Sequence, residues 1–129
     1  MHSESGAGLV STLSGVGVFL FFVLFATQIL LHLVAASFVN AAAFDAARLA
    51  SGAGDVTADA AADHGLAVLG SFAGRVSRFD VAVRPTSVTV EVEAVSPALV
   101  PEAVSRALGA ASIQRSITVR REQVRCEGC

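Results

Sequence analysis

The sequence predicts an α+β protein. A long N-terminal transmembrane helix continues into a small domain with a second helix and a three-stranded antiparallel sheet. The window from Ser5 to Phe44 contains no Asp, Glu, Lys or Arg. After a glycine-marked turn at 51–54, a helical period of apolar residues gives way to segments of alternating apolar and polar residues. These patterns divide the chain into a short N-terminal segment (1–8), the long helix (9–51), the α+β domain (52–125) and a C-terminal tail (126–129).

The apolar run near the N-terminus is long enough to cross a bilayer, whose core of about 30 Å needs about 20 helical residues. We place the membrane-spanning segment at 14–36. One helix is expected up to residue 51, because no Gly or Pro separates the run from "FVNAAAFDAARLAS" at 38–51. The alternative is a cleaved secretory signal, since "AAAF" at 41–44 offers an A-x-A pattern. Against it, the run exceeds the about 7 to 15 apolar residues of a signal peptide.

Small side chains recur every fourth residue on this helix. They are Ala42, Ala43, Ala46, Ala47 and Ala50, and Ser11 and Gly15 repeat the spacing inside the apolar run. Such spacing lets another backbone approach closely, so we identify these residues as candidate helix-packing positions. The high helix propensity of alanine also explains the composition, and both interpretations stay open.

Gln28 and His32 are also candidate helix-packing positions, because they lie one turn apart within the apolar run. A polar group at membrane depth needs a partner, so we expect a facing helix or a hydrogen bond between the two. A position of His32 near the outer interface is the other interpretation. Asp45 and Arg48 can pair on the helix surface for about 0.2–0.5 kcal/mol, and we interpret them as marking where the helix meets water.

The segment at 55–76, "DVTADAAADHGLAVLGSFAGRV", predicts a second, amphipathic helix with Asp55 or Thr57 as its N-cap. Its apolar face comprises Ala58, Ala61, Ala62, Gly65, Leu69, Phe72 and Val76.

Period-two alternation predicts a β-hairpin over 79–94 with "RPTS" as its turn. The inward residues are Phe79, Val81, Val83, Val88, Val90, Val92 and Ala94. Pro101 is expected to be the first residue of a short helix and Gly109 its stop. The segment 112–124 then predicts a third strand with Ile117 and Val119 inward. So small a domain buries only about 60% of its unfolded surface, so we expect stabilisation from the long helix or from neighbouring subunits.

No catalytic constellation is recognisable. His64 stands alone in an alanine-rich helix, and "SGVGVF" at 14–19 lies inside the apolar run rather than in a phosphate-binding loop. We therefore expect no enzyme, no cofactor, no metal and no small-molecule substrate. The net charge is −2, with nine Arg and no Lys interleaved with acids, which argues against nucleic acid as a partner.

Cys126 and Cys129 form a C-x-x-C pair near the end of the chain. A local disulfide and free thiols are both open interpretations. Zinc would need two further ligands, and the sequence offers only scattered His residues for that purpose.

Taken together, residues 8–51 resemble the TadE-like family of minor pilins or pseudopilins of the Tad (Flp) pilus, in an actinobacterial-type version. A Gly precedes an "ST"-containing entry to the apolar helix, and a Gln lies late in that helix. An AAxxxAR-like segment, "AAAFDAAR", follows at 41–48, and "SVTVEVEAVSPALVP" at 87–101 is also similar.

The resemblance implies a pilin-like fold and a non-enzymatic role in the assembly or structure of a pilus or secretion filament. It implies membrane lipid, other pilin or pseudopilin subunits and the pilus assembly machinery as partners. It also implies a single-pass cell-membrane protein, with a cytoplasmic N-terminus and an extracytoplasmic domain that can associate with a pilus at the cell surface.

The family's prepilin peptidase site maps to Gly8 and Leu9, the residues before and after the cut. This sequence departs from the family pattern, because the fifth residue after the cut is Leu13 where the family has Glu, and no Lys or Arg precedes Gly8. Cleavage and a permanent anchor therefore both stay open. Two other functions are considered: a single-span protein whose outer domain binds a partner outside any filament, and a domain secreted after signal-peptidase cleavage.

Overall fold

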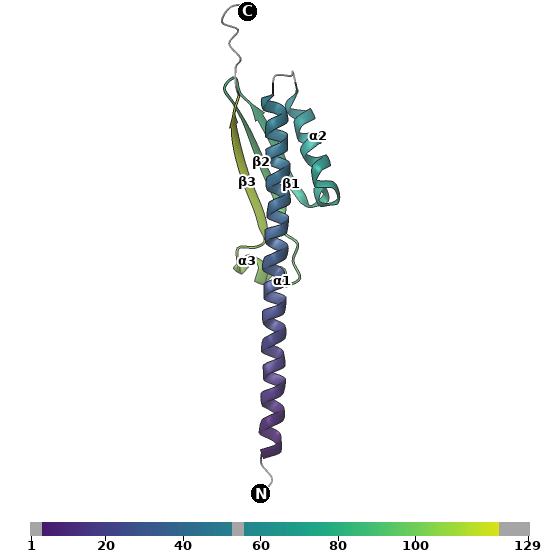
Figure 1. Cartoon of the computed structure of the whole chain (residues 1–129), viewed down its shortest axis with the longest axis vertical. Helices are drawn as coiled ribbons and strands as arrows, with labels where there is room; N and C mark the ends of the chain where they lie inside the picture. The colour runs from purple at the N-terminus through teal and green to yellow at the C-terminus, as the bar shows by residue number, and fades with distance from the viewer. Residues whose placement is uncertain (1–3, 53–55, 122–129) are drawn as a thin grey trace, which may run out of the picture.

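A single long helix, α1 (Glu4–Ser51), forms the axis of the molecule, and the other elements gather along its second half (Figure 1). The computed structural model describes residues 4–52 and 56–121. The further elements are α2 (Ala58–Leu69), the 3-10 helix η1 (Gly70–Arg75), β1 (Val76–Val83), β2 (Ser87–Val95), α3 (Glu102–Ala107) and β3 (Ser112–Arg120). The predicted α+β fold is confirmed, and α1 is long and apolar enough to cross a membrane.

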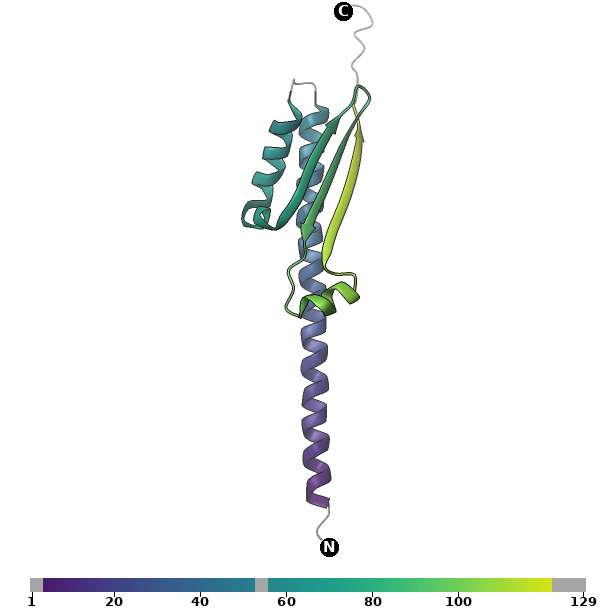
Figure 2. The ribbon, with the colours of Figure 1, turned by 180° about the vertical axis from the view of Figure 1, so that it is seen from behind.

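The domain has two layers. The sheet has the order β1-β2-β3 with both pairs antiparallel. Seen from behind, α1 and α2 lie side by side against the same face of the sheet (Figure 2), with α1 over β2 and β3 and α2 over β1. The opposite face of the sheet carries no helix among the described residues, and it is therefore open to solvent.

The hairpin follows the predicted alternation. Arg84 closes the turn by donating its backbone N–H to the Ser87 carbonyl at 2.8 Å. The four predicted inward residues of β2 are all buried, namely Val88, Val90, Val92 and Ala94. On β1, Phe79 and Val81 are partly buried. Val83, predicted to point inward, is 38% exposed because it lies at the end of an edge strand, whereas its register partner Val88 on the central strand is buried.

The second helix is shorter than predicted. It ends at Leu69, because Gly70 adopts a φ of 54°, a left-handed conformation that a helix cannot continue through. Val76 begins β1 instead of extending the helical face, so the hairpin starts three residues before the predicted Phe79. At the other end Thr57 is the N-cap, as one of the two predicted candidates, with its Oγ1 accepting from the Ala60 N–H at 3.2 Å.

Helix α2 approaches β1 closely at one point. A Cβ atom added to Gly65 would lie only 2.3 Å from Cζ of Phe79, well inside van der Waals contact. The absence of a side chain at Gly65 therefore leaves room for the Phe79 ring, and this contact joins α2 to the sheet.

Three other boundaries differ from the predictions. α1 begins at Glu4 rather than residue 9, since no proline interrupts the chain before the apolar run. Pro101 is the N-cap of α3 rather than its first helical residue, while Gly109 follows the helix with a φ of 66°. β3 ends at Arg120, and the predicted strand residues 122–124 lie outside the described residues.

The core is built around the alanines of α1. Ala42, Ala43, Ala46, Ala47 and Ala50 are at most 1% exposed, and all of them except Ala42 belong to the core cluster that contains the inward valines of β2. Their small side chains let the sheet and α2 come close to the helix axis. The alanine face thus meets the domain of its own chain. Asp45 and Arg48 are exposed on the opposite side and form no ion pair with each other.

We expect Ala46→Leu to destabilise the domain, because three extra heavy atoms must fit against the sheet where no space is free. Overpacking of this kind costs about 1–3 kcal/mol. The control is Ala41→Leu, on the same helix but exposed. Thermal unfolding of the full chain in detergent should show a lower midpoint for the first variant only, and equal midpoints would contradict the packing described above.

Candidate membrane and subunit contact surfaces

Gln28 joins α1 to the loop that follows β2. Its side-chain amide donates from Nε2 to the Pro97 carbonyl at 3.0 Å, and its Oε1 accepts from the Leu99 N–H at 2.8 Å. The side chain is 2% exposed, so both polar ends of a buried amide are satisfied. Neither expected partner, a facing helix or the neighbouring His32, is the one observed.

His32 contacts the same loop one turn further on. Its Nδ1 lies 3.0 Å from Oγ of Ser96, a side chain that is itself buried. The Ser96 N–H donates to the Ala111 carbonyl at 3.1 Å, which ties the start of the loop to the residues before β3. The sequence contained one signal for this contact, namely two polar groups on one face of an apolar helix. It offered nothing that singled out residues 96–99 as the partner.

Below Gln28, the apolar side chains of α1 are not covered by the domain. The exposed large residues are Val10, Leu13, Val16, Val18, Phe19, Leu20, Phe21, Phe22, Val23, Leu24 and Phe25. Gly8 is exposed as well, and the backbone of Leu9 is helical, so the candidate processing site lies within α1. Ser11 is exposed, and a Cβ at Gly15 would meet no atom within 4 Å. These two candidate packing positions have no packing partner within the described part of the chain.

The membrane-spanning segment at 14–36 stays a prediction, although the domain covers part of that range. Gln28, Ala35 and Ala36 are buried by the domain and cannot face lipid. Residues 5–27 still form an uncharged stretch. At about 1.5 Å per residue this stretch is roughly 34 Å long, enough for a bilayer core of about 30 Å.

Above Gln28, the side of α1 opposite the alanine face stays apolar. We call this surface the upper stripe, and it consists of Leu30, Leu33, Val34, Phe38, Ala41 and Phe44. Its large side chains are between 43% and 60% exposed, although they lie at the height of the domain. The stripe ends where Asp45 and Arg48 appear on the same side of the helix.

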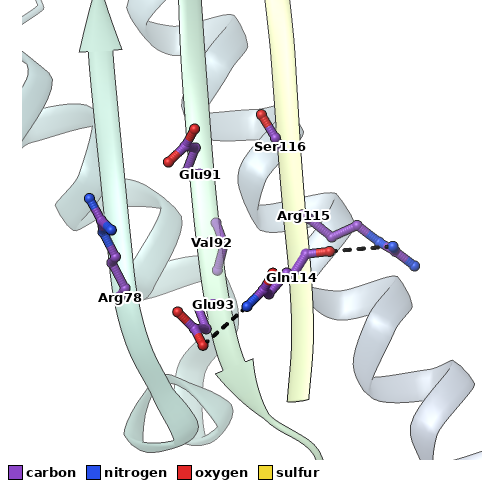
Figure 3. A pocket seen from close by; sticks show the side chains of 7 residues that line it. All are labelled: Arg78, Glu91, Val92, Glu93, Gln114, Arg115 and Ser116. Atoms are coloured by element: carbon purple, nitrogen blue, oxygen red, sulfur yellow. Dashed lines mark hydrogen bonds between the residues drawn. The ribbon is translucent and has the colours of Figure 1, made fainter. Parts of the chain in front are cut away.

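The open face of the sheet is polar (Figure 3). Gln114 donates to a carboxylate oxygen of Glu93 at 3.3 Å, and the Arg78 guanidinium donates to Asp80. This hydrogen bond raises the pKa of Arg78, and the nearby charges of Glu91 and Glu93 act in the same direction. This face thus carries charges of both signs, and among residues 4–52 and 56–121 no cluster of acids, His and Cys is suited to a metal ion.

Arg115 lies on the core-facing side of β3, because its register partner is the buried Val92. Figure 3 shows its side chain reaching past the strand, away from Glu93. β3 is an edge strand, and an inward-pointing charge on an edge opposes pairing with a further strand. Contact with another copy through this edge is therefore disfavoured.

The other candidate residues from the sequence are His64, Cys126 and Cys129. His64 is exposed on α2. Cys126 and Cys129 lie outside the described residues, so their pairing stays a prediction. Within residues 4–52 and 56–121, the surfaces that stand out are the bare lower part of α1 and the upper stripe.

We expect Gln28→Leu to destabilise the domain. The change leaves the Leu99 N–H and the Pro97 carbonyl without their partners, at a cost of about 1–3 kcal/mol in the free energy of unfolding. Gln114→Leu is the matched control, since it is exposed on the sheet and should change that free energy by about 0.5 kcal/mol or less. Denaturant unfolding of the full chain in detergent measures both, and a loss for Gln114→Leu as large as for Gln28→Leu would contradict the role given to Gln28.

Comparison of the chain with family models, curated proteins and solved structures finds no match. Its function is therefore inferred from its own surfaces and from the sequence resemblance given above.

Proposed function

We propose that the chain is a non-enzymatic, membrane-anchored minor pilin or pseudopilin of a Tad/Flp-type pilus or secretion filament. Its N-terminal helix holds the subunit in the membrane with the N-terminus in the cytoplasm, and the α+β domain lies outside. Its partners are membrane lipid, other pilin or pseudopilin subunits and the assembly machinery.

The observation that carries the proposal is the length of the exposed apolar surface on α1. Exposed apolar side chains run from Val10 to Phe44. At about 1.5 Å per residue this distance is roughly 51 Å, whereas a bilayer core covers only about 30 Å. A surface roughly 20 Å longer than the lipid can cover needs a second protein surface, and a helix from another subunit meets this need.

A permanently solitary anchor is the less favoured alternative. Such a protein would leave the upper stripe in water, and contiguous exposed apolar patches commonly mark interaction sites. The open face of the sheet offers a partner charged and polar groups rather than a contiguous apolar surface. The edge strand β3 carries the inward Arg115, so the upper stripe is the surface best suited to assembly.

A secreted domain released at Phe44 fits the structure poorly. Cleavage there would remove Ala35, Ala36, Val39, Ala42 and Ala43, all buried against the rest of the domain. The sheet would lose the larger part of the helix that covers β2 and β3. Such a product would have to expose the valines of β2.

The mature N-terminus distinguishes these functions. Mass determination of the chain from membranes and from sheared surface filaments should give a chain in the filament fraction that begins at Leu9 or is intact from Met1. A start at Leu9 shows pilin-type processing. An intact chain found only in membranes would support a solitary anchor, and a start at Phe44 would rule out both forms of the proposal.

We expect Ala41→Glu to reduce incorporation into filaments by several fold while the domain stays folded. The new carboxylate would lie in the middle of the upper stripe and would be buried unpaired in a subunit contact, which is costly. Ala60→Glu is the control, as an exposed helical alanine on α2. The measurement is the amount of each variant in sheared fractions relative to membranes, with thermal unfolding as the check on folding. Normal incorporation of the Ala41 variant would exclude the upper stripe from the contact.

A further inference from the structure

We propose that α3 and its flanking residues form a foot that rests in the lipid interface of the outer leaflet and sets the depth of the protein in the membrane. The foot comprises residues 98–108. This inference rests on the proposed membrane anchoring, but it does not require assembly into a filament.

The foot exposes apolar side chains that its own chain leaves uncovered. Leu99, Val104 and Leu108 are 58%, 45% and 52% exposed. The buried side chain in α3 is Ser105, whose hydroxyl donates to the backbone carbonyls of Pro101 and Glu102. The foot therefore buries a hydroxyl and exposes Leu99, Val104 and Leu108, which is an arrangement that suits an apolar environment outside the domain.

The height of the foot is fixed on α1. The two hydrogen bonds of Gln28 to Pro97 and Leu99 hold the beginning of the foot at the point where the bare apolar segment ends. At its other end, Leu108 shares a hollow of about 250 Å³ with Phe25 and Ile29. Both views show α3 crossing α1 at the lower end of the sheet (Figures 1 and 2).

This height coincides with the expected lipid boundary. Residues 5–27, the part of the uncharged window that precedes the buried Gln28, have the length of a bilayer core, so the upper end of this part is expected at the level of the headgroups. The apolar residues of the foot are therefore continuous with a surface that already faces lipid. A protein partner at this level would have to displace lipid from the foot and from the adjoining surface of α1.

The charges of the foot agree with an interfacial position. Glu102 and Arg106 pair one turn apart on α3, with their side chains 80% and 71% exposed. Interfacial elements keep charged groups towards water and lay apolar groups into the headgroup and acyl boundary. Because this pair is neutral overall, we expect contact with zwitterionic lipid and little dependence on anionic lipid.

The test uses the full chain, with Cys126→Ser and Cys129→Ser, at one copy per phosphatidylcholine nanodisc. Nitroxide labels are attached at Leu108→Cys and Leu99→Cys in the foot, at Phe21→Cys in the bare helix and at Ala82→Cys on the open sheet face. Electron paramagnetic resonance then compares relaxation by oxygen, which concentrates in lipid, with relaxation by a water-soluble nickel chelate.

We expect the oxygen-to-nickel ratio at positions 108 and 99 to be several-fold higher than at 82 and to approach that at 21. A foot label as accessible to nickel as position 82 would overturn the inference, and so would a foot label shielded from both reagents. A high oxygen-to-nickel ratio at position 21 with a low ratio at position 108 would agree with membrane anchoring and would contradict only the placement of the foot in lipid. A low ratio at 21 contradicts the anchoring itself. Replacing part of the lipid with phosphatidylglycerol should leave the ratios unchanged.

Discussion

The two hydrogen bonds of Gln28 set the height at which the domain is attached to its helix. An amide side chain in an apolar helix is costly unless both of its ends are satisfied, and here the loop backbone at Pro97 and Leu99 satisfies them. The large apolar side chains from Val10 to Phe25 are exposed, whereas beyond Gln28 the domain covers one side of α1. In the proposed membrane protein, the boundary between lipid-facing and protein-covered helix would therefore lie at this side chain and its two partners.

The alanine face makes the covered half possible. The sheet and α2 could not form a core of adequate size by themselves in a domain this small. The alanines let α1 approach closely enough for the valines of β2 to pack directly on the helix, so helix and sheet depend on each other. The same arrangement leaves the upper stripe free, because a helix packed against a single layer can be covered on one side only.

Local patterns predicted the elements of the fold better than their contacts. The alternation of Val88, Val90, Val92 and Ala94 identified a half-buried strand directly. The helical period continued past Gly70, so only the left-handed conformation of that glycine reveals where α2 ends. The partner of Gln28 could not be predicted, since Leu99 lies 71 residues away and a backbone N–H leaves no trace in the sequence. The four-residue spacing of the alanines could likewise be recognised in the sequence. That spacing alone could not identify the chain's own sheet as the surface that packs against it.

In the proposed assembly, the two exposed apolar surfaces of α1 would contribute differently. Helices in lipid gain little from the hydrophobic effect on association, because lipid tails are as apolar as the side chains they replace. The small residues Ser11 and Gly15 can thus permit close approach without driving it. In the proposed membrane position, the upper stripe would stand above the bilayer, where the alternative to protein contact is water and burial of apolar surface is favourable. The free energy of association should therefore come mainly from Leu30 to Phe44, and the lipid-facing half of the helix should set the geometry of the contact.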